Sequence, residues 1–261
     1  MTSHARSAVD GAPPAPEARV FLEEMTSAEI RDAIGAGKTT VLICNASTES
    51  SGPHLAVGKH IVRARYVAER VARELGTALV APVMPFAPTS DEYRFPGTVH
   101  LPATTFSAVN EAVAASMIKT GFRYVVLTGD HDGNQDVLAA LAPKMDAIHR
   151  PHGARVFFSG DGFDKAGREM GAYLNEHGYP PSRHGGVSDT SLLWGVDGAY
   201  VRPARLAVGA PVPPPDSALA LGDAGWEGDP RRASPELGKM FLEWKVRCSV
   251  AEIRRLIEGT A

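Results

Sequence analysis

Three short segments of the sequence gather side chains that bind metal ions or transfer protons. They are residues 48–60, 130–134 and 183–191, and each of them combines histidine with a carboxylic acid. Histidine nitrogen mixed with carboxylate oxygen suits zinc or manganese. The sequence therefore suggests that side chains from these segments converge on one divalent cation.

The elements that must position these segments alternate between strand and helix. Buried strands are predicted at residues 39–47, 78–86, 123–129 and 154–160, and helices at residues 26–36, 61–75, 104–120, 135–149, 164–176 and 234–257. The apolar runs do not alternate with polar residues, as expected for parallel strands that helices cover on both faces. We therefore predict a three-layer α/β/α fold with a mostly parallel sheet, as a single domain over residues 19–261.

This fold predicts where the site lies. Segments 48–60 and 130–134 each follow a predicted strand. In open α/β sheets, binding sites lie outside the carboxyl ends of the strands. Both segments are therefore expected at one edge of the sheet.

Two segments are expected to lie outside the regular elements. Residues 1–18 are rich in Ala, Pro and Ser without periodicity, which predicts a flexible N-terminal arm. Residues 203–235 hold many of the 20 prolines and are predicted to form a long surface loop.

Composition excludes several classes of partner. The chain has 261 residues and a formal net charge of -3, so no basic field favours nucleic acid or anionic lipid. No apolar run approaches the ~20 residues of a membrane span, and the first residues lack the apolar stretch of a signal peptide. We expect a cytoplasmic protein without a nucleic-acid or membrane partner. Cys44 and Cys248 have no CxxC spacing and are expected to be buried thiols.

Two glycine-containing segments resemble nucleotide loops but lack the required spacing. The segment from Gly35 to Thr39 has Asp32 where the phosphate loop needs its first glycine. After Gly160 and Gly162, the third glycine of a dinucleotide loop is replaced by Lys165. We therefore expect no nucleotide cofactor.

At the three polar segments the chain resembles the creatininase family of metal-dependent amidohydrolases. Residues 49–60 are similar to the family's EQHGPHLPLGTD, residues 128–134 to NGHGGN, and residues 184–191 to HAGxxETS. Shorter similarities occur in the same order at residues 21–26, 95–98, 121–123 and 228–231. The resemblance implies an α/β/α fold, a homo-oligomer that is often a hexamer, and a pair of metal ions that activate water to attack a carbon-nitrogen bond.

The resemblance assigns the family's first metal ion to Glu49, His60 and His131. His60 stands where the family has an aspartate that bridges both ions, and Ser51 stands where the family has a histidine for the second ion. A neutral imidazole offers one lone pair and cannot bridge. We therefore expect one ion per subunit, zinc or alternatively manganese, on a Glu-His-His set that leaves room for water.

Proton transfer is expected from the remaining polar side chains. By the resemblance, His184 matches the histidine of HAG, and Asp189 replaces the glutamate of ETS, so His184 is expected to donate a proton and Asp189 to act as a base or an outer ligand. Asp132 stands where many relatives have glycine, and three roles are open: metal ligand, partner that orients His131, or solvated loop residue.

Other conspicuous side chains are expected to be structural. His54 is expected to make a structural hydrogen bond. The sequence allows either a place in the pocket or a place in the core for four further residues, Tyr93, Arg94, Phe163 and Trp194. A surface position is expected for His100, His149, His152 and His177.

The function expected from these residues is a metal-dependent hydrolase of a small amide or cyclic amide, although the changed ligands argue against creatinine itself. Two alternatives remain open. A peptidase-like relative that trims a modified peptide would need an open groove. A non-catalytic oligomeric scaffold or binding protein need not retain a stoichiometric ion.

Overall fold

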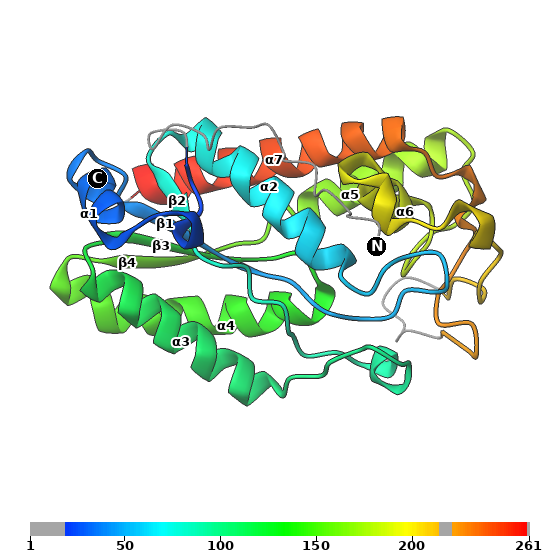
Figure 1. The fold of residues 1–261 in the computed structure, drawn as a ribbon, viewed down its shortest axis with the longest axis horizontal. Helices are drawn as coiled ribbons and strands as arrows, with labels where there is room; N and C mark the ends of the chain where they lie inside the picture. Colours follow the sequence, from blue (N-terminus) through cyan, green and yellow to red (C-terminus); the bar gives the residue numbers. More distant parts are fainter. Residues whose placement is uncertain (1–18, 214–220, 260–261) are drawn as a thin grey trace, which may run out of the picture.

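The protein folds around a parallel sheet. The computed structural model describes residues 19–213 and 221–259, so the predicted arm at residues 1–18 lies outside the described residues (Figure 1). Within them the sheet has the order β2-β1-β3-β4. All three pairings are parallel, and the strands are β1 (Thr40–Asn45), β2 (Ala78–Val80), β3 (Tyr124–Gly129) and β4 (Arg155–Ser159).

Helices cover both faces of this sheet (Figure 1). One face packs against α1 (Ser27–Gly35), α3 (Ala103–Lys119) and α4 (Asp132–His149), and the other against α2 (Lys59–Leu75) and α7 (Pro235–Glu258). Beyond the sheet, α7 also packs against α5 (Asp164–Glu176) and α6 (Val187–Val196). The predicted three-layer α/β/α fold is confirmed.

The strand β1 shows why residues 41–44 are apolar without alternation. Val41 and Ile43 point to the α3 and α4 layer, whereas Leu42 and Cys44 point to the α2 and α7 layer. Burial raises the pKa of the Cys44 thiol to about 12. Cys44 and Cys248 are both buried and free, as predicted.

The register between β1 and β3 brings two of the polar segments together. Asn45 at the end of β1 pairs with Gly129 at the end of β3, and the amide of Asp130 donates to the carbonyl of Asn45 over 2.9 Å. The side-chain amide of Asn134 donates to the same carbonyl over 2.9 Å. The chain segments that leave the two strands are thereby fixed side by side.

Several boundaries differ from the prediction. The strand β2 ends at Val80 because Pro82 and Pro85, which lack an N–H donor, interrupt the predicted run. The helix α2 begins at Lys59 rather than at residue 61, and α4 begins at Asp132 rather than at residue 135. Both helices therefore start inside the polar segments.

The helix α6 was not predicted, because its apolar residues do not form a single stripe. Leu192 packs against α5 and α7, whereas the neighbouring Leu193 packs against Leu55 and Val201. A Cβ atom on Gly238 of α7 would lie 1.7 Å from the carbonyl oxygen of Ser191. Glycine at this position allows the close approach of α6 and α7.

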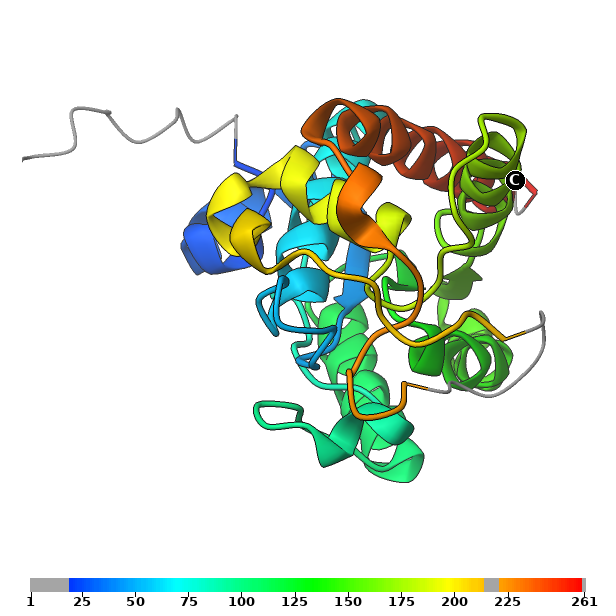
Figure 2. The same cartoon turned by 90° about the vertical axis from the view of Figure 1, so that its right-hand side faces the viewer.

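The prediction of a surface loop at residues 203–235 is wrong for part of that segment. Leu221, Trp226 and Glu227 are buried. The amide of Glu227 donates to the carbonyl of His184 over 2.8 Å. The part of the prediction that falls on residues 214–220 lies outside the described residues. In Figure 2 the described parts, yellow to orange, cross the end of the molecule, and residues 227 and 228 pack there on the segment around His184.

Among the described residues, no helix combines the length and the apolar composition that a bilayer span requires.

Candidate metal centre

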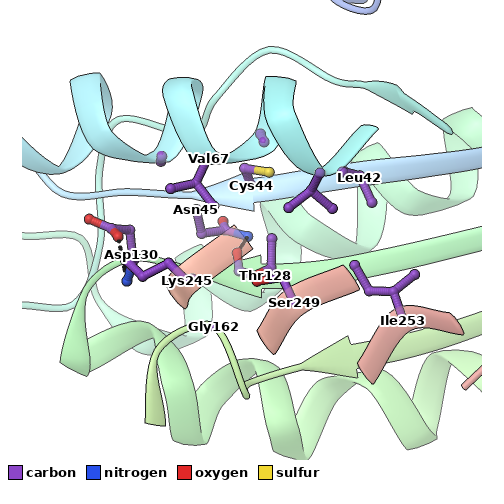
Figure 3. A pocket seen from close by; sticks show the side chains of 14 residues that line it. Leu42, Cys44, Asn45, Val67, Thr128, Asp130, Gly162, Lys245, Ser249 and Ile253 are labelled. Carbon is purple, nitrogen blue, oxygen red and sulfur yellow. Dashed lines mark hydrogen bonds and ion pairs between the residues drawn. The ribbon is translucent and has the colours of Figure 1, made fainter. Parts of the chain in front are cut away.

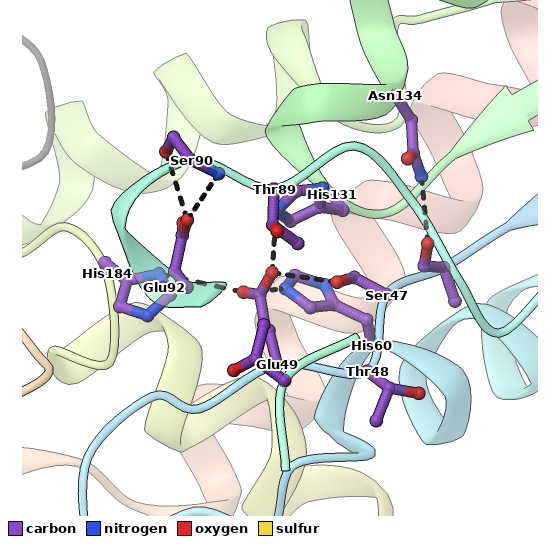
Figure 4. Close-up of polar contacts among 12 residues, drawn as sticks. Ser47, Thr48, Glu49, His60, Thr89, Ser90, Glu92, His131, Asn134 and His184 are labelled. Carbon is purple, nitrogen blue, oxygen red and sulfur yellow. Dashed lines mark hydrogen bonds and ion pairs between the residues drawn. The ribbon is translucent and has the colours of Figure 1, made fainter. Parts of the chain in front are cut away.

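The three predicted metal ligands meet around a fully buried carboxylate (Figure 4). Glu49 Oε1 lies 2.9 Å from His60 Nε2, and Glu49 Oε2 lies 2.7 Å from His131 Nε2. One ligand atom from each of the three residues lies within 4.8 Å of the other two. Glu49 comes from the loop after β1, His60 from the first turn of α2, and His131 from the residue before α4.

One tautomer of His60 suits a divalent ion at this site. Its Nδ1 lies 2.9 Å from Asp130 Oδ2, which can only accept, and 2.8 Å from Arg63 Nη2, which can only donate. In the neutral tautomer that donates from Nδ1 to Asp130, Nε2 carries a lone pair that faces the lone pairs of Glu49 Oε1. A cation between these atoms removes the repulsion, and carboxylates commonly orient metal-binding histidines in this way.

The protonation equilibria of the site show how the charge of Glu49 is balanced. Burial acts to raise the pKa of Glu49, but His60, His131 and Lys59 hold this pKa well below its usual range. Burial acts to lower the pKa of His131, and the Glu49 carboxylate outweighs it, so that the pKa of His131 is raised. Glu49 therefore stays ionised, and its charge is balanced by Lys59 and by the proton that the raised pKa of His131 favours, a proton that a metal ion would have to displace.

Asp130 connects the centre to two buried cations. Its Oδ2 accepts from Arg63 Nη2 over 2.7 Å, and its Oδ1 lies 3.1 Å from Lys245 Nζ. Burial acts to raise the pKa of Asp130, but Arg63 and Lys245 hold it far below its usual range. Sequence reasoning assigned no role to Asp130, although its place between a strand end and His131 was a usable signal.

The space beside the Asp130 and Lys245 pair is too small for a substrate. Figure 3 shows this pair at one end of an internal cavity of about 40 Å³ between the sheet, α2 and α7. Such a volume holds roughly one or two waters.

Lys59 and Arg63, one helical turn apart on α2, hold Asp189 from the other side. Lys59 Nζ lies 2.8 Å from Asp189 Oδ2 and 3.4 Å from Glu49 Oε1, and Arg63 Nη1 lies 2.5 Å from Asp189 Oδ1. Burial acts to raise the pKa of Asp189, but Lys59 and Arg63 hold it well below its usual range. Sequence reasoning missed both cations, and their i, i+4 spacing beside His60 was the available signal.

His184 approaches the same carboxylate with its other ring nitrogen. Its Nε2 donates to the carbonyl of Ser50 over 2.9 Å, so its Nδ1 carries a lone pair and lies 3.7 Å from Glu49 Oε1. Burial and the Lys59 charge lower the pKa of His184, which favours the neutral ring. The structure thus brings His184 and Asp189 to the predicted ligands.

Glu92 was missed entirely. It lies in a short 3-10 helix, Asp91–Arg94, and its side chain is buried, with Oε2 accepting from the amide of Ser90 over 2.8 Å. Together with Glu49 and His184 it forms a second group that offers ligand atoms to a cation (Figure 4). A single glutamate in a loop gives no sequence signal, because only the folded chain brings it to the site.

The other residues singled out in the sequence lie in different surroundings. Asp132 is exposed at the first position of α4 and lines the mouth of the pocket. His54 is buried and bonds to the carbonyl of Gly185 over 2.8 Å, as its structural role predicted. Phe163 lines the pocket, Trp194 is half-buried and packs against a small buried cluster, and Tyr93 and Arg94 are exposed. His100, His152 and His177 are exposed as predicted, and His149 is half-buried.

The pocket above the centre has a volume of about 360 Å³. Its polar floor includes Glu49, Lys59 and His184, and its wall is apolar, formed by Phe163, Met170, Leu174 and Leu192. The ligand set therefore opens into a space of mixed polarity.

Comparison with known proteins matches this arrangement to one family. The model of a family described as Creatininase: Creatinine amidohydrolase matches residues 23–253. The chain belongs to the creatininase family. Creatininases are metal-dependent hydrolases of carbon-nitrogen bonds, and the resemblance found in the sequence is confirmed over nearly the whole chain.

Solved creatininase structures share the fold. A mutant creatininase of Zn-Zn type is 24% identical, with a TM-score of 0.78, and the match covers 91% of this chain and 98% of that one. A structure named Creatininase Mn is 23% identical, with a TM-score of 0.77 and the same coverage. A putative creatinine amidohydrolase from Bacteroides fragilis is 18% identical, with a TM-score of 0.73, covering 91% of this chain and 96% of that one. A comparison with curated protein sequences found no match.

The Asp130→Asn variant tests whether this creatininase-family centre uses Asp130 to orient His60. We expect its affinity for zinc to fall about 10- to 100-fold, because His60 loses a charged acceptor. Competition with a chromophoric chelator measures the affinity. Asp132→Asn, an exposed neighbour, is the matched control and should keep the affinity of the unmodified protein. Unchanged affinity in a folded Asp130→Asn protein would show that Asp130 does not support the ligand set.

Proposed function

We propose that this protein is a hydrolase that binds one divalent ion, zinc or alternatively manganese, and cleaves an amide or cyclic amide bond of a small molecule. The main observation that supports this proposal is the convergence of Glu49, His60 and His131 at the floor of the pocket. When bound, the ion polarises the substrate carbonyl and lowers the pKa of a water molecule.

The shape of the site supports a small substrate. Glu49, His60 and His131 are each at most 5% exposed, and the pocket above them measures about 360 Å³. Sites for small molecules span roughly 300 to 1,000 Å³. The peptidase-like alternative needs an open groove that would place an extended chain against these ligands, and their burial argues against it.

His184 is the group proposed to transfer the proton. Its ring is fixed by the bond from Nε2 to the carbonyl of Ser50, and its Nδ1 faces Glu49 with a free lone pair. A neutral imidazole can accept a proton from the attacking water and deliver it to the departing nitrogen. The departing nitrogen thereby receives the proton that it needs in order to leave.

The two aspartates have supporting roles in this proposal. Asp189 fixes Lys59 and Arg63, which keeps positive charge beside the reacting carbonyl. Asp132 lies at the exposed mouth of the pocket, where it is placed to exchange protons between the site and solvent.

Removal of the ion tests the proposed chemistry. Protein purified without chelator should contain about one zinc or manganese ion per subunit, since three protein ligands leave a position for water. The assay uses a panel of small cyclic amides and N-acyl amines, creatinine included. Chelation should abolish hydrolysis, and added zinc should restore it. A protein without a retained ion and without activity on the panel would instead support the scaffold alternative.

The His184→Ala variant tests the proton transfer. Turnover should fall by roughly 10²-fold or more, as is usual for a lost acid-base group, while the ion content stays unchanged. Asp189→Asn is the companion variant. It should lower turnover with the ion retained if Asp189 acts through Lys59 and Arg63, and it should lose the ion if Asp189 is a ligand. Near-normal turnover in a metal-loaded His184→Ala protein would rule out His184 as the proton donor.

We further propose that the protein acts as a homo-oligomer in the cytoplasm. Four large apolar side chains are exposed, which suits a subunit interface, and they are Val57, Phe86, Tyr93 and Val99. The free thiols Cys44 and Cys248 suit a reducing compartment. Light scattering at micromolar concentration should give a multiple of the subunit mass, and the subunit mass alone would contradict the oligomer.

A further inference from the structure

Lys59 is a cation with almost no access to solvent beside the candidate metal centre. Its side chain is 1% exposed, and Nζ lies 3.4 Å from Glu49 Oε1 and 2.8 Å from Asp189 Oδ2. Lysine is almost never fully buried unless it is paired. It directly precedes the candidate ligand His60 in the first turn of α2, so the same helix delivers an ammonium group and a ligand to one carboxylate.

The oxygen that Lys59 contacts also belongs to the second ligand group. Glu49, Glu92 and His184 are all buried and offer ligand atoms within 4.8 Å of one another. His184 Nδ1 lies 3.7 Å from Glu49 Oε1, the oxygen that Lys59 approaches. Two carboxylates and an imidazole lone pair suit a divalent ion, but the ammonium of Lys59 competes for the shared oxygen.

The charge balance of the buried network decides whether the Lys59 ammonium or a second divalent ion lies beside Glu49, Glu92 and His184. Four buried or nearly buried carboxylates, Glu49, Glu92, Asp130 and Asp189, surround three buried cations, Lys59, Arg63 and Lys245. The network thus carries one formal negative charge when its histidines are neutral. One divalent ion brings it close to neutrality. A second would leave a large positive charge out of contact with water, which is strongly unfavourable.

We propose that the Lys59 ammonium occupies the place of a second cation, so that the protein binds one ion, and that removal of Lys59 turns Glu49, Glu92 and His184 into a second divalent site. This inference rests on the proposed function for the first ion on Glu49, His60 and His131. In the unmodified protein, Lys59 supplies beside the pocket the positive charge that a second ion would bring.

The test compares the ion content of three proteins dialysed against manganese. The unmodified protein and Lys59→Arg, which keeps the charge, should each retain about one ion per subunit. Lys59→Met should retain about two, because Glu49 Oε1 is freed and the network gains one negative charge. Electron paramagnetic resonance gives an independent readout. Isolated Mn²⁺ signals are expected in the first two proteins and an exchange-coupled signal in Lys59→Met.

Two further variants test which residues hold the second ion and provide a replacement if Lys59→Met does not fold. Lys59→Met combined with Glu92→Gln should return to about one ion, because the second group loses a charged ligand. Lys59→Gln also removes the ammonium charge, so the network gains one negative charge as in Lys59→Met, while Arg63 still pairs with Asp189. This variant should also bind about two ions, and its polar side chain makes it the replacement for Lys59→Met if that protein does not fold.

The outcomes distinguish the inference from the proposed function. Two ions in the unmodified protein, or the same ion count in a folded protein without Lys59, would overturn the inference. If the unmodified protein retains no ion, the proposed function is overturned. The inference is then tested separately, by whether the protein without Lys59 binds one ion more than the unmodified protein, on Glu92 and His184.

Discussion

The buried carboxylate of Glu49 constrains everything around it. A charge removed from water is unfavourable by several kcal/mol or more unless neighbouring groups compensate it. Glu49 has no solvent exposure, and His60, His131 and Lys59 all lie against its two oxygens. Two of these neighbours have carboxylate partners of their own, Asp130 for His60 and Asp189 for Lys59. The polar interior is therefore one connected network, and changing one member alters the charge that the others experience.

The fold supplies this network from only a few elements. The pairing of Asn45 with Gly129 sets the loop after β1 beside the segment after β3, which brings Glu49 to His131. The first two turns of α2 then contribute Lys59, His60 and Arg63 from nearly one face. On the opposite side, residues 226–228 hold the segment that carries His184 through a backbone bond and an isolated bridge. The positions of the catalytic candidates thus depend on strand register and on one long connection.

Sequence reasoning predicted the parts of this arrangement that local patterns encode. Apolar runs of strand length predicted the central sheet and its two helical layers, because burial on both faces leaves no polar alternation. The motif around Glu49, His60 and His131 predicted the ligands that the structure brings together. Boundaries were less accurate, since the first turns of α2 and α4 contain charged and glycine residues that do not show helical periodicity. The helix α6 was missed because its buried side chains point to two different clusters.

The sequence by itself determined the fold class and the family and proposed three metal ligands, since each of these conclusions rests on local patterns and short motifs. Only the tertiary structure decided which charges compensate one another. Asp189 looks like a free base in the sequence, but Lys59, 130 residues earlier, holds one of its oxygens. Glu92 looks like a loop residue, but it lies with Glu49 and His184. Electrostatic interactions depend on distance and on the local dielectric, and for segments far apart in sequence both are fixed only when the chain has packed.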